Sequence, residues 1–188
     1  MLNDTLKAQL QAHLQRLIWP IELVASLDDS QGSSQMRELM SVLAQLSPLI
    51  TVREDGLDSR RPSFSIARQG GEARLRFAAV PLGHEFTSLV LALLWAGGHP
   101  PKVEPQILDQ ARHIVGQHDF EVYMSLSCHN CPDVVQALSL LALTNPSVTT
   151  TVIDGALHQA EVQRRNILAV PLVLRNGDRK STRLNSSH

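Results

Sequence analysis

Along the first fifty residues, the hydrophobic positions follow helical spacing in some segments and form short strand-like runs in others. Recurring leucines at three- and four-residue intervals predict an N-terminal helix behind an Asp4 or Thr5 cap, which Trp19-Pro20 ends. A short apolar run and a second helical pattern follow, with Asp28 to Ser34 as a turn-rich loop. The predicted elements are a helix over 6–17, a strand over 21–25, a helix over 36–46 and a strand over 50–54.

A hairpin and an apolar helix complete the first hundred residues. Strands are expected at 63–68 and 74–78, joined by Gln69-Gly70-Gly71. The helix over 85–96 is apolar on nearly all sides, which is typical of a buried helix, and Gly97-Gly98 ends it. Residues 1–100 therefore predict one αβ unit.

The second part of the chain repeats this pattern after a linker helix over 104–115. Residues 20–27 align with 118–125, an offset of 98 residues, and both are strands followed by a loop and a helix. Further matches pair 51–56 with 151–155 and Arg61-Pro62 with Val170-Pro171, and a short helix is expected over 158–165.

A βαβ unit followed by a proline-led hairpin is the outline of a thioredoxin fold. The sequence thus predicts an α/β protein of two tandem thioredoxin-like, three-layer α/β/α halves packed together. The expected domains are 1–100, without cysteines, and 101–177, truncated at its C-terminus. The segment 178–188 is polar and aperiodic, and we expect it to be a disordered tail foreign to the fold.

Composition narrows the classes of partner and compartment. Seventeen basic and 18 acidic side chains give a formal charge of −1, which disfavours a nucleic-acid partner. Charged residues interrupt the apolar positions of the N-terminal helix, whereas a signal peptide has an uninterrupted apolar core. The most apolar stretch, 86–96, is about half as long as the ~20 residues that a membrane-spanning helix needs. We expect a cytoplasmic protein that binds neither nucleic acid nor membrane.

The two cysteines, Cys128 and Cys131, form a CxxC motif between a predicted strand and a helix that Pro132 opens. Free N–H groups and the macrodipole at a helix N-terminus favour a thiolate. Cys128, the more exposed, should exchange disulfides with a partner, and Cys131 should resolve the mixed disulfide. The alternative is a metal half-site, but a structural zinc site usually needs a second CxxC or a HxxxH pair, and the chain has neither.

Four further residues are candidates for facing a substrate. Val170-Pro171 precedes a predicted strand over 172–175, where a thioredoxin-like fold places a cis-proline that leaves the preceding backbone groups free for an extended substrate. Proline at a strand start is also common without such a role. His129 and Asn130 lie between the cysteines, and they are either tuning groups or solvated turn residues.

Residues 81–95 and 125–138 closely resemble the N-terminal domain of AhpF, the NADH-peroxiredoxin reductase component of alkyl hydroperoxide reductase, and the similarity runs from about Met1 to Gly177. The resemblance implies a tandem thioredoxin-like domain tethered to a flavoprotein that takes electrons from NADH through FAD. It further implies that the dithiol passes these electrons to a peroxiredoxin, the AhpC component. By the same resemblance Cys128 is the interchange thiol, Cys131 is its partner, and Glu85 lies near the pair.

Glu85 has two interpretations. It follows Gly83-His84 at the start of the apolar helix, where a carboxylate interacts favourably with the macrodipole and needs no other role. Alternatively it accepts and returns a proton as thiol becomes thiolate.

The chain contains no GxGxxG and no second CxxC, so we expect the flavin module to lie outside it and no cofactor other than the disulfide. NADH-driven turnover would then need that module. Two rival functions remain, a glutaredoxin-like disulfide reductase and a binding module without redox activity.

Overall fold

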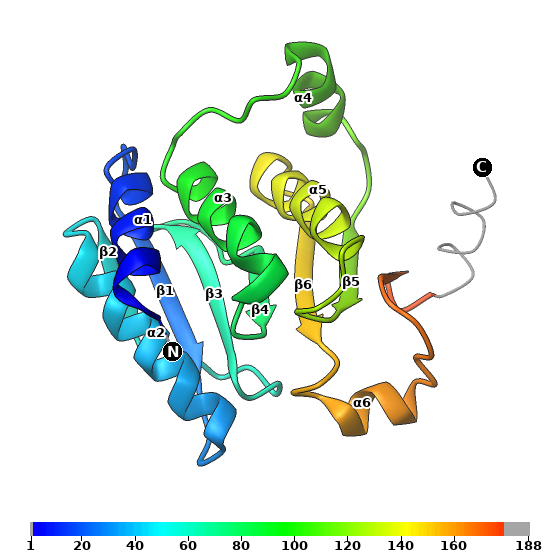
Figure 1. The fold of residues 1–188 in the computed structure, drawn as a ribbon. Coiled ribbons are helices and arrows are strands. Elements are labelled where there is room, and N and C mark those ends of the chain that lie inside the picture. Colours follow the sequence, from blue (N-terminus) through cyan, green and yellow to red (C-terminus); the bar gives the residue numbers. More distant parts are fainter. Residues whose placement is uncertain (1, 179–188) are drawn as a thin grey trace.

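A computed structural model describes residues 2–178 of the chain (Figure 1). The elements of the first hundred residues are α1 Asp4–Leu14, β1 Ile21–Ser26, α2 Gln31–Leu46, β2 Ile50–Arg53, β3 Ser63–Arg68, β4 Leu75–Ala78, the 3-10 turn η1 Gly83–Glu85 and α3 Phe86–Ala96. They are followed by α4 Pro105–Arg112, β5 His118–Met124, α5 Cys131–Thr144, β6 Val148–Asp154, α6 Gln159–Arg164 and β7 Leu172–Arg175.

All seven strands form one mixed sheet in the order β2-β1-β3-β4-β6-β5-β7. In the first half, the central strand β1 pairs in parallel with β2 and antiparallel with β3. In the second half, the central strand β5 pairs in the same way with β6 and β7. The two groups join where β4 pairs in parallel with β6. The predicted α/β fold class of two thioredoxin-like halves is confirmed.

Both predicted prolines open the corresponding strands, and both peptide bonds, Arg61-Pro62 and Val170-Pro171, are cis. The sheet register corrects the offset expected from the sequence. Ser26 pairs with the first residue of β3, and Tyr123 pairs with the first residue of β7, so the offset between β1 and β5 is 97 residues and not 98. A slip of one residue exchanges the two faces of a strand.

The first two helices begin differently from the prediction. Asn3, not Asp4 or Thr5, caps α1, since its side chain accepts the N–H of Leu6 at 2.8 Å and its own backbone is extended. Ser30 caps α2 in the same way, so that the predicted loop of residues 28–34 is shorter and its last four residues are helical. α1 begins two residues and α2 five residues before the predicted starts, because short polar side chains satisfy free N–H groups outside the apolar pattern. α1 ends at Leu14, three residues before its predicted end.

The main core lies between one face of the sheet and α1, α2, α3 and α5, which lie on the same side of it in Figure 1. The apolar α3 contacts both α1 and α5, which accounts for its lack of a polar face. Val162 of α6 packs instead on a second, smaller cluster formed by Ala78, Tyr123, Ile153, Ile167 and Leu174.

The expectations about a membrane span and about the C-terminal tail concern residues that the structure describes only in part. No helix among residues 2–178 is both long and apolar enough to cross a membrane. The expected tail lies outside the described residues, except for Asp178, which pairs with Arg175 across a turn of Asn176 and Gly177, both at positive φ. That turn has the dihedral signs of a type I′ hairpin turn, a signal that Asn-Gly carries in the sequence.

Candidate functional site

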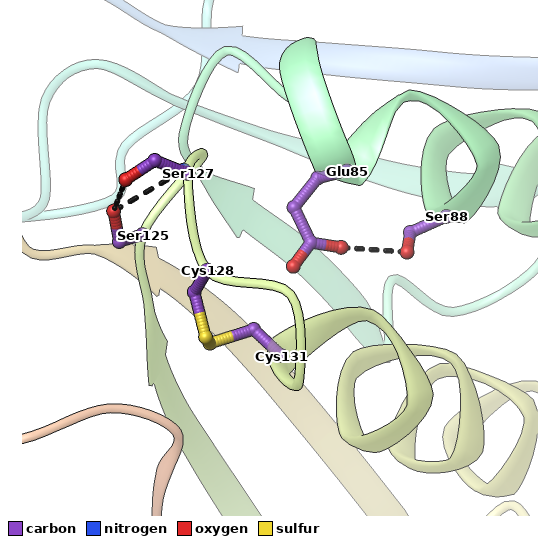
Figure 2. Close-up of a disulfide and its surroundings, with 6 residues drawn as sticks. All are labelled: Glu85, Ser88, Ser125, Ser127, Cys128 and Cys131. Carbon is purple, nitrogen blue, oxygen red and sulfur yellow. Dashed lines mark hydrogen bonds between the residues drawn. A yellow bond between two sulfur atoms is a disulfide. The ribbon is translucent and has the colours of Figure 1, made fainter.

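Cys128 and Cys131 form a disulfide at the start of α5, with their Cα atoms 5.5 Å apart (Figure 2). Cys131 is the first residue of the helix, Asn130 precedes it as the cap residue, and Pro132 occupies the second position. Proline is favoured there because the first N–H groups of a helix have no intrahelical partner. The sulfurs therefore lie where the helix macrodipole stabilises negative charge.

The two cysteines differ in exposure. The side chain of Cys131 is fully buried and packs in the main core, whereas Cys128 is half-buried. His129 and Asn130, between them, are exposed. A partner molecule can thus reach Cys128 and the two intervening residues, while Cys131 is reached only from inside the protein.

Short hydrogen-bonded turns fix the loop from β5 to Cys128. The backbone N–H of Cys128 donates to the carbonyl of Ser125 at 3.1 Å, and the Ser125 and Ser127 hydroxyls lie within 3.1 Å of each other. The loop therefore presents Cys128 at a defined place beside the end of the sheet.

The first half of the chain supplies one wall of the site through η1. The N–H of His84 donates to the carbonyl of Leu126 at 3.0 Å, so the turn lies directly on the cysteine loop. The His84 and His129 rings contact each other with centroids 4.3 Å apart. This ring pair was not predicted from the sequence, because His84 has no other histidine at a metal-ligand spacing.

Glu85 is fully buried beside this wall, as the residue before α3. The Ser88 hydroxyl donates to its Oε1 atom at 2.6 Å, while Oε2 is buried without a hydrogen-bond partner. Figure 2 shows the carboxylate directed from η1 toward the segment that carries the cysteines. Burial raises the pKa of Glu85 above its ordinary value, although the Ser88 hydrogen bond acts in the opposite direction.

Pro171 stands directly before β7, whose first residue pairs with Tyr123 in β5. Since β5 runs on from Tyr123 through Met124 into the cysteine loop, the proline lies at the sheet end where the disulfide is found. Val170 and Pro171 are both half-buried.

Two residues near Glu85 were not predicted from the sequence: one contacts Glu85 directly, and the other contacts it through the first. Ser88 is the polar residue of α3 on its buried face, and Gln136 of α5 donates to its hydroxyl at 3.1 Å. A buried serine three residues after Glu85 in an apolar helix was the available signal. Gln136 could not be assigned without the packing of α3 on α5.

Within residues 2–178, no three His, Cys, Asp or Glu side chains are grouped so as to hold a metal ion.

Comparisons with known proteins show what the whole chain is similar to. The chain is 54% identical over 178 residues to the alkyl hydroperoxide reductase component AhpF of Pseudomonas putida and 53% identical to that of Escherichia coli, covering 95% and 94% of this chain. The crystal structure of the N-terminal domain of AhpF from Enterococcus faecalis superposes with a TM-score of 0.84 at 26% identity, over 95% of this chain and 92% of that one. The chain is a homologue of the N-terminal domain of AhpF.

The chain spans about a third of the length of these AhpF relatives, 34% in both cases. No family model matches it. The resemblance noted in the sequence is confirmed by these relatives, and the chain carries a disulfide at the start of α5.

Proposed function

We propose that this domain relays electrons by a dithiol–disulfide cycle of Cys128 and Cys131, from a flavin-dependent reductase module to a peroxiredoxin that removes alkyl hydroperoxides. The observation that carries the proposal is the disulfide at the N-terminus of α5, with Cys131 fully buried and Cys128 accessible. This is the arrangement that a two-step exchange with a protein disulfide requires.

The exchange proceeds in two steps once the pair is reduced. The Cys128 thiolate attacks one sulfur of the partner's disulfide, which forms an intermolecular disulfide and releases the partner's second sulfur as a thiolate. Cys131 then loses its proton and attacks the Cys128 sulfur. This closes the Cys128–Cys131 bond and releases the partner's first sulfur as a thiolate, so that two electrons have passed to the partner, whose two thiolates take up protons from water.

Glu85 is proposed as the catalytic group that takes the Cys131 proton. Cys131 is buried, so water has little access to its thiol, and the free Oε2 atom of Glu85 is buried on the same side. A carboxylate whose pKa is raised by burial is a better base near neutral pH than an exposed one.

The groups around Cys128 are proposed to contact the partner. His129 and Asn130 are exposed beside the accessible sulfur, and Val170 and Pro171 lie at the same end of the sheet. Pro171 has no N–H, so the backbone groups next to it are available to an extended segment of the partner.

The residues of this chain do not fit a flavin or a nicotinamide dinucleotide. The four strand-to-helix connections within residues 2–178, which precede α2, η1, α5 and α6, lack the run of glycines that lets a dinucleotide diphosphate approach the backbone. We therefore assign FAD and NADH to a separate module, and we place the relay in the reducing cytoplasm. We also assign residues 1–100 to a half that positions the site and 101–177 to the half that carries it.

Trapping tests the relay directly. Cys131→Ser in the reduced chain, mixed with an oxidised peroxiredoxin, should form a stable mixed disulfide through Cys128, because the resolving thiol is missing. Cys128→Ser should form little or none, since its remaining thiol is buried.

The adduct is detected on a non-reducing gel and located by mass spectrometry of its peptides. An adduct confined to Cys128→Ser would reverse the assignment of the two cysteines. A reduced wild-type chain that reduces glutathionylated peptides but no peroxiredoxin would favour the glutaredoxin-like alternative.

A further inference from the structure

A row of hydrogen bonds leads from the helix of the buried cysteine to Glu85. Gln136 of α5 donates through Nε2 to the Ser88 hydroxyl at 3.1 Å, and that hydroxyl donates to Oε1 of Glu85 at 2.6 Å. Ser88 and Glu85 are 1% and 0% exposed. Because Gln136 and Cys131 belong to the same helix, the row ties the orientation of the carboxylate to α5.

The direction of each hydrogen bond in this row is fixed. A serine hydroxyl has one hydrogen, and accepting the Gln136 N–H leaves that hydrogen free to point at Glu85. Oε1 is thereby held, and Oε2 remains the oxygen without a partner. Figure 2 shows the held oxygen on the side of Ser88 and the other oxygen on the side of the disulfide.

We propose that Ser88 and Gln136 are positioning residues for the dithiol reaction, which hold Glu85 so that Oε2 faces the cysteine pair and receives the proton of Cys131. This inference rests on the proposed relay and deepens it. The proton leaves the Cys131 sulfur for Oε2 as that sulfur attacks Cys128, and Oε1 keeps its hydrogen bond in both protonation states of the carboxyl.

The Ser88 hydrogen bond has a second effect on the same atom. Burial favours the neutral carboxylic acid, and a hydroxyl that donates to the carboxylate favours the ionised form. Ser88 thus lowers the pKa of Glu85 relative to burial alone and favours the ionised form, which can accept a proton. Without it, the carboxyl would hold its own proton up to a higher pH.

The other titratable groups around Glu85 are few. On η1 and the cysteine loop they are His84, His129 and the cysteines themselves, and α3 carries no charged side chain. The charged or titratable residues of the neighbouring elements α5, α1 and β3 are Asp133, Asp4, Lys7, His13 and Arg68. None of these residues is changed in the variants below.

Two-phase kinetics with a small disulfide separate the two cysteines. The reduced full chain is mixed with the aromatic disulfide dithiobis(nitrobenzoate), which releases one coloured thiolate when Cys128 attacks and a second when Cys131 closes the disulfide. We expect Ser88→Ala to slow the second phase about tenfold at neutral pH and to move its pH midpoint up by about one unit. The first phase should change less than about twofold, because Cys128 does not depend on this row for its access.

Gln136→Leu should shift the second phase in the same direction by a smaller factor, about two- to fivefold, since the Ser88 hydroxyl is still present but no longer oriented. Ser139→Ala is the matched control. Ser139 is also a buried serine, on α5, but its hydroxyl donates to the carbonyl of Val135 and contacts no carboxylate. That variant should keep the wild-type pH profile.

Glu85→Gln completes a double-mutant cycle. If the row acts through Glu85, Ser88→Ala adds nothing to the second phase in the Glu85→Gln background. A wild-type profile in Ser88→Ala alongside a changed profile in Glu85→Gln overturns the positioning role and leaves the relay intact. Wild-type profiles in both variants overturn the role of Glu85 as well. If Ser88→Ala and Ser139→Ala change the second phase equally, the effect comes from the loss of a buried hydroxyl in general, and the positioning role is overturned.

Discussion

Gly83 lies at φ +57°, and a Cβ atom placed there would come within 3.0 Å of the carbonyl oxygen of Leu126. Left-handed backbone is costly for residues with a Cβ. The close approach allows the His84 N–H to reach the same carbonyl at 3.0 Å. A single glycine thus lets η1, and with it Glu85, lie against the cysteine loop.

Gly83→Ala should lower the free energy of unfolding by about 2–3 kcal/mol, from the φ penalty and the contact together. Gly70→Ala is the control, because Gly70 has a φ of +82° but a methyl group added there would have no atom within 4 Å. It should lose about 1 kcal/mol. Urea unfolding at neutral pH measures both, and equal losses would show that the approach to Leu126 costs nothing.

Glu85 also makes the stability of the fold depend on pH. Its pKa is raised in the folded protein from an ordinary value of 4.5, so folding binds a proton between that value and the raised pKa. The folded state is therefore favoured below pH 4.5, and this contribution is lost as the pH rises through the raised pKa. The negative charge that Glu85 carries above its raised pKa opposes folding.

Glu85→Gln should therefore raise the melting temperature at pH 7 by a few degrees, because the amide keeps an acceptor for Ser88 and carries no charge. The difference from wild type should vanish below about pH 4, where both side chains are neutral. Calorimetry at the two pH values checks this. A constant difference at both would mean that packing, and not ionisation, separates the proteins.

At the scale of elements, an ion-pair network holds α6 to the rest of the fold. Arg60, in the loop before β3, donates to both carboxylate oxygens of Glu161 on α6 at 2.9 and 3.0 Å, and it also pairs with Glu121 of β5. Burial alone would raise the pKa of Glu161, but hydrogen bonds from Arg60 and Tyr123 outweigh it and hold that pKa below the ordinary value. The first half thereby anchors the helix that precedes Pro171.

Arg60→Met should lower the free energy of unfolding by about 2–4 kcal/mol at pH 7, since it leaves two partly buried glutamates without their shared partner. Arg37→Met is the control, because Arg37 pairs with Glu54 where both side chains are about half exposed. It should cost less than about 1 kcal/mol. Urea unfolding of both variants and wild type provides the comparison.

The pH dependence of the Arg60 variant follows from Glu161. Its lowered pKa contributes stability that is present above the ordinary value of 4.5 and is lost as the pH falls through the lowered pKa. The gap between wild type and Arg60→Met should narrow below about pH 4. If the difference in unfolding free energy between the two proteins is unchanged in acid, Arg60 stabilises the fold through packing and not through its charge.

For the molecule as a whole, sequence periodicity predicted the elements better than their assembly. The strands 63–68 and 172–175 have the expected bounds because a proline starts each and the apolar run is short. The offset between the halves was wrong by one residue, since Val24 and Val122 look alike in sequence but face opposite sides of the sheet: Val122 lies in the main core, whereas Val24 lines a surface groove.

In the candidate site, too, the local features could be predicted from the sequence and the contacts between distant elements could not. The CxxC motif, Pro132 and the strand before them are local, so the sequence was enough to place the disulfide at a helix start. The contacts of Glu85 depend on how α3 lies against α5, and the pairing of β4 with β6 links residues more than seventy positions apart. Neither can be read from periodicity, because periodicity gives the apolar face of an element but not its partner.

That pairing leads to a prediction about the two halves. Residues 101–178 alone would expose the edge of β6 that pairs with β4, and the face of α5 that packs on α3. We expect the full chain to unfold in one calorimetric transition and the 101–178 fragment to show no cooperative transition of its own. A fragment that melts cooperatively, or two separate transitions in the full chain, would show that the halves fold independently. In that case β4–β6 pairing would join two stable units, and would not be needed to complete either of them.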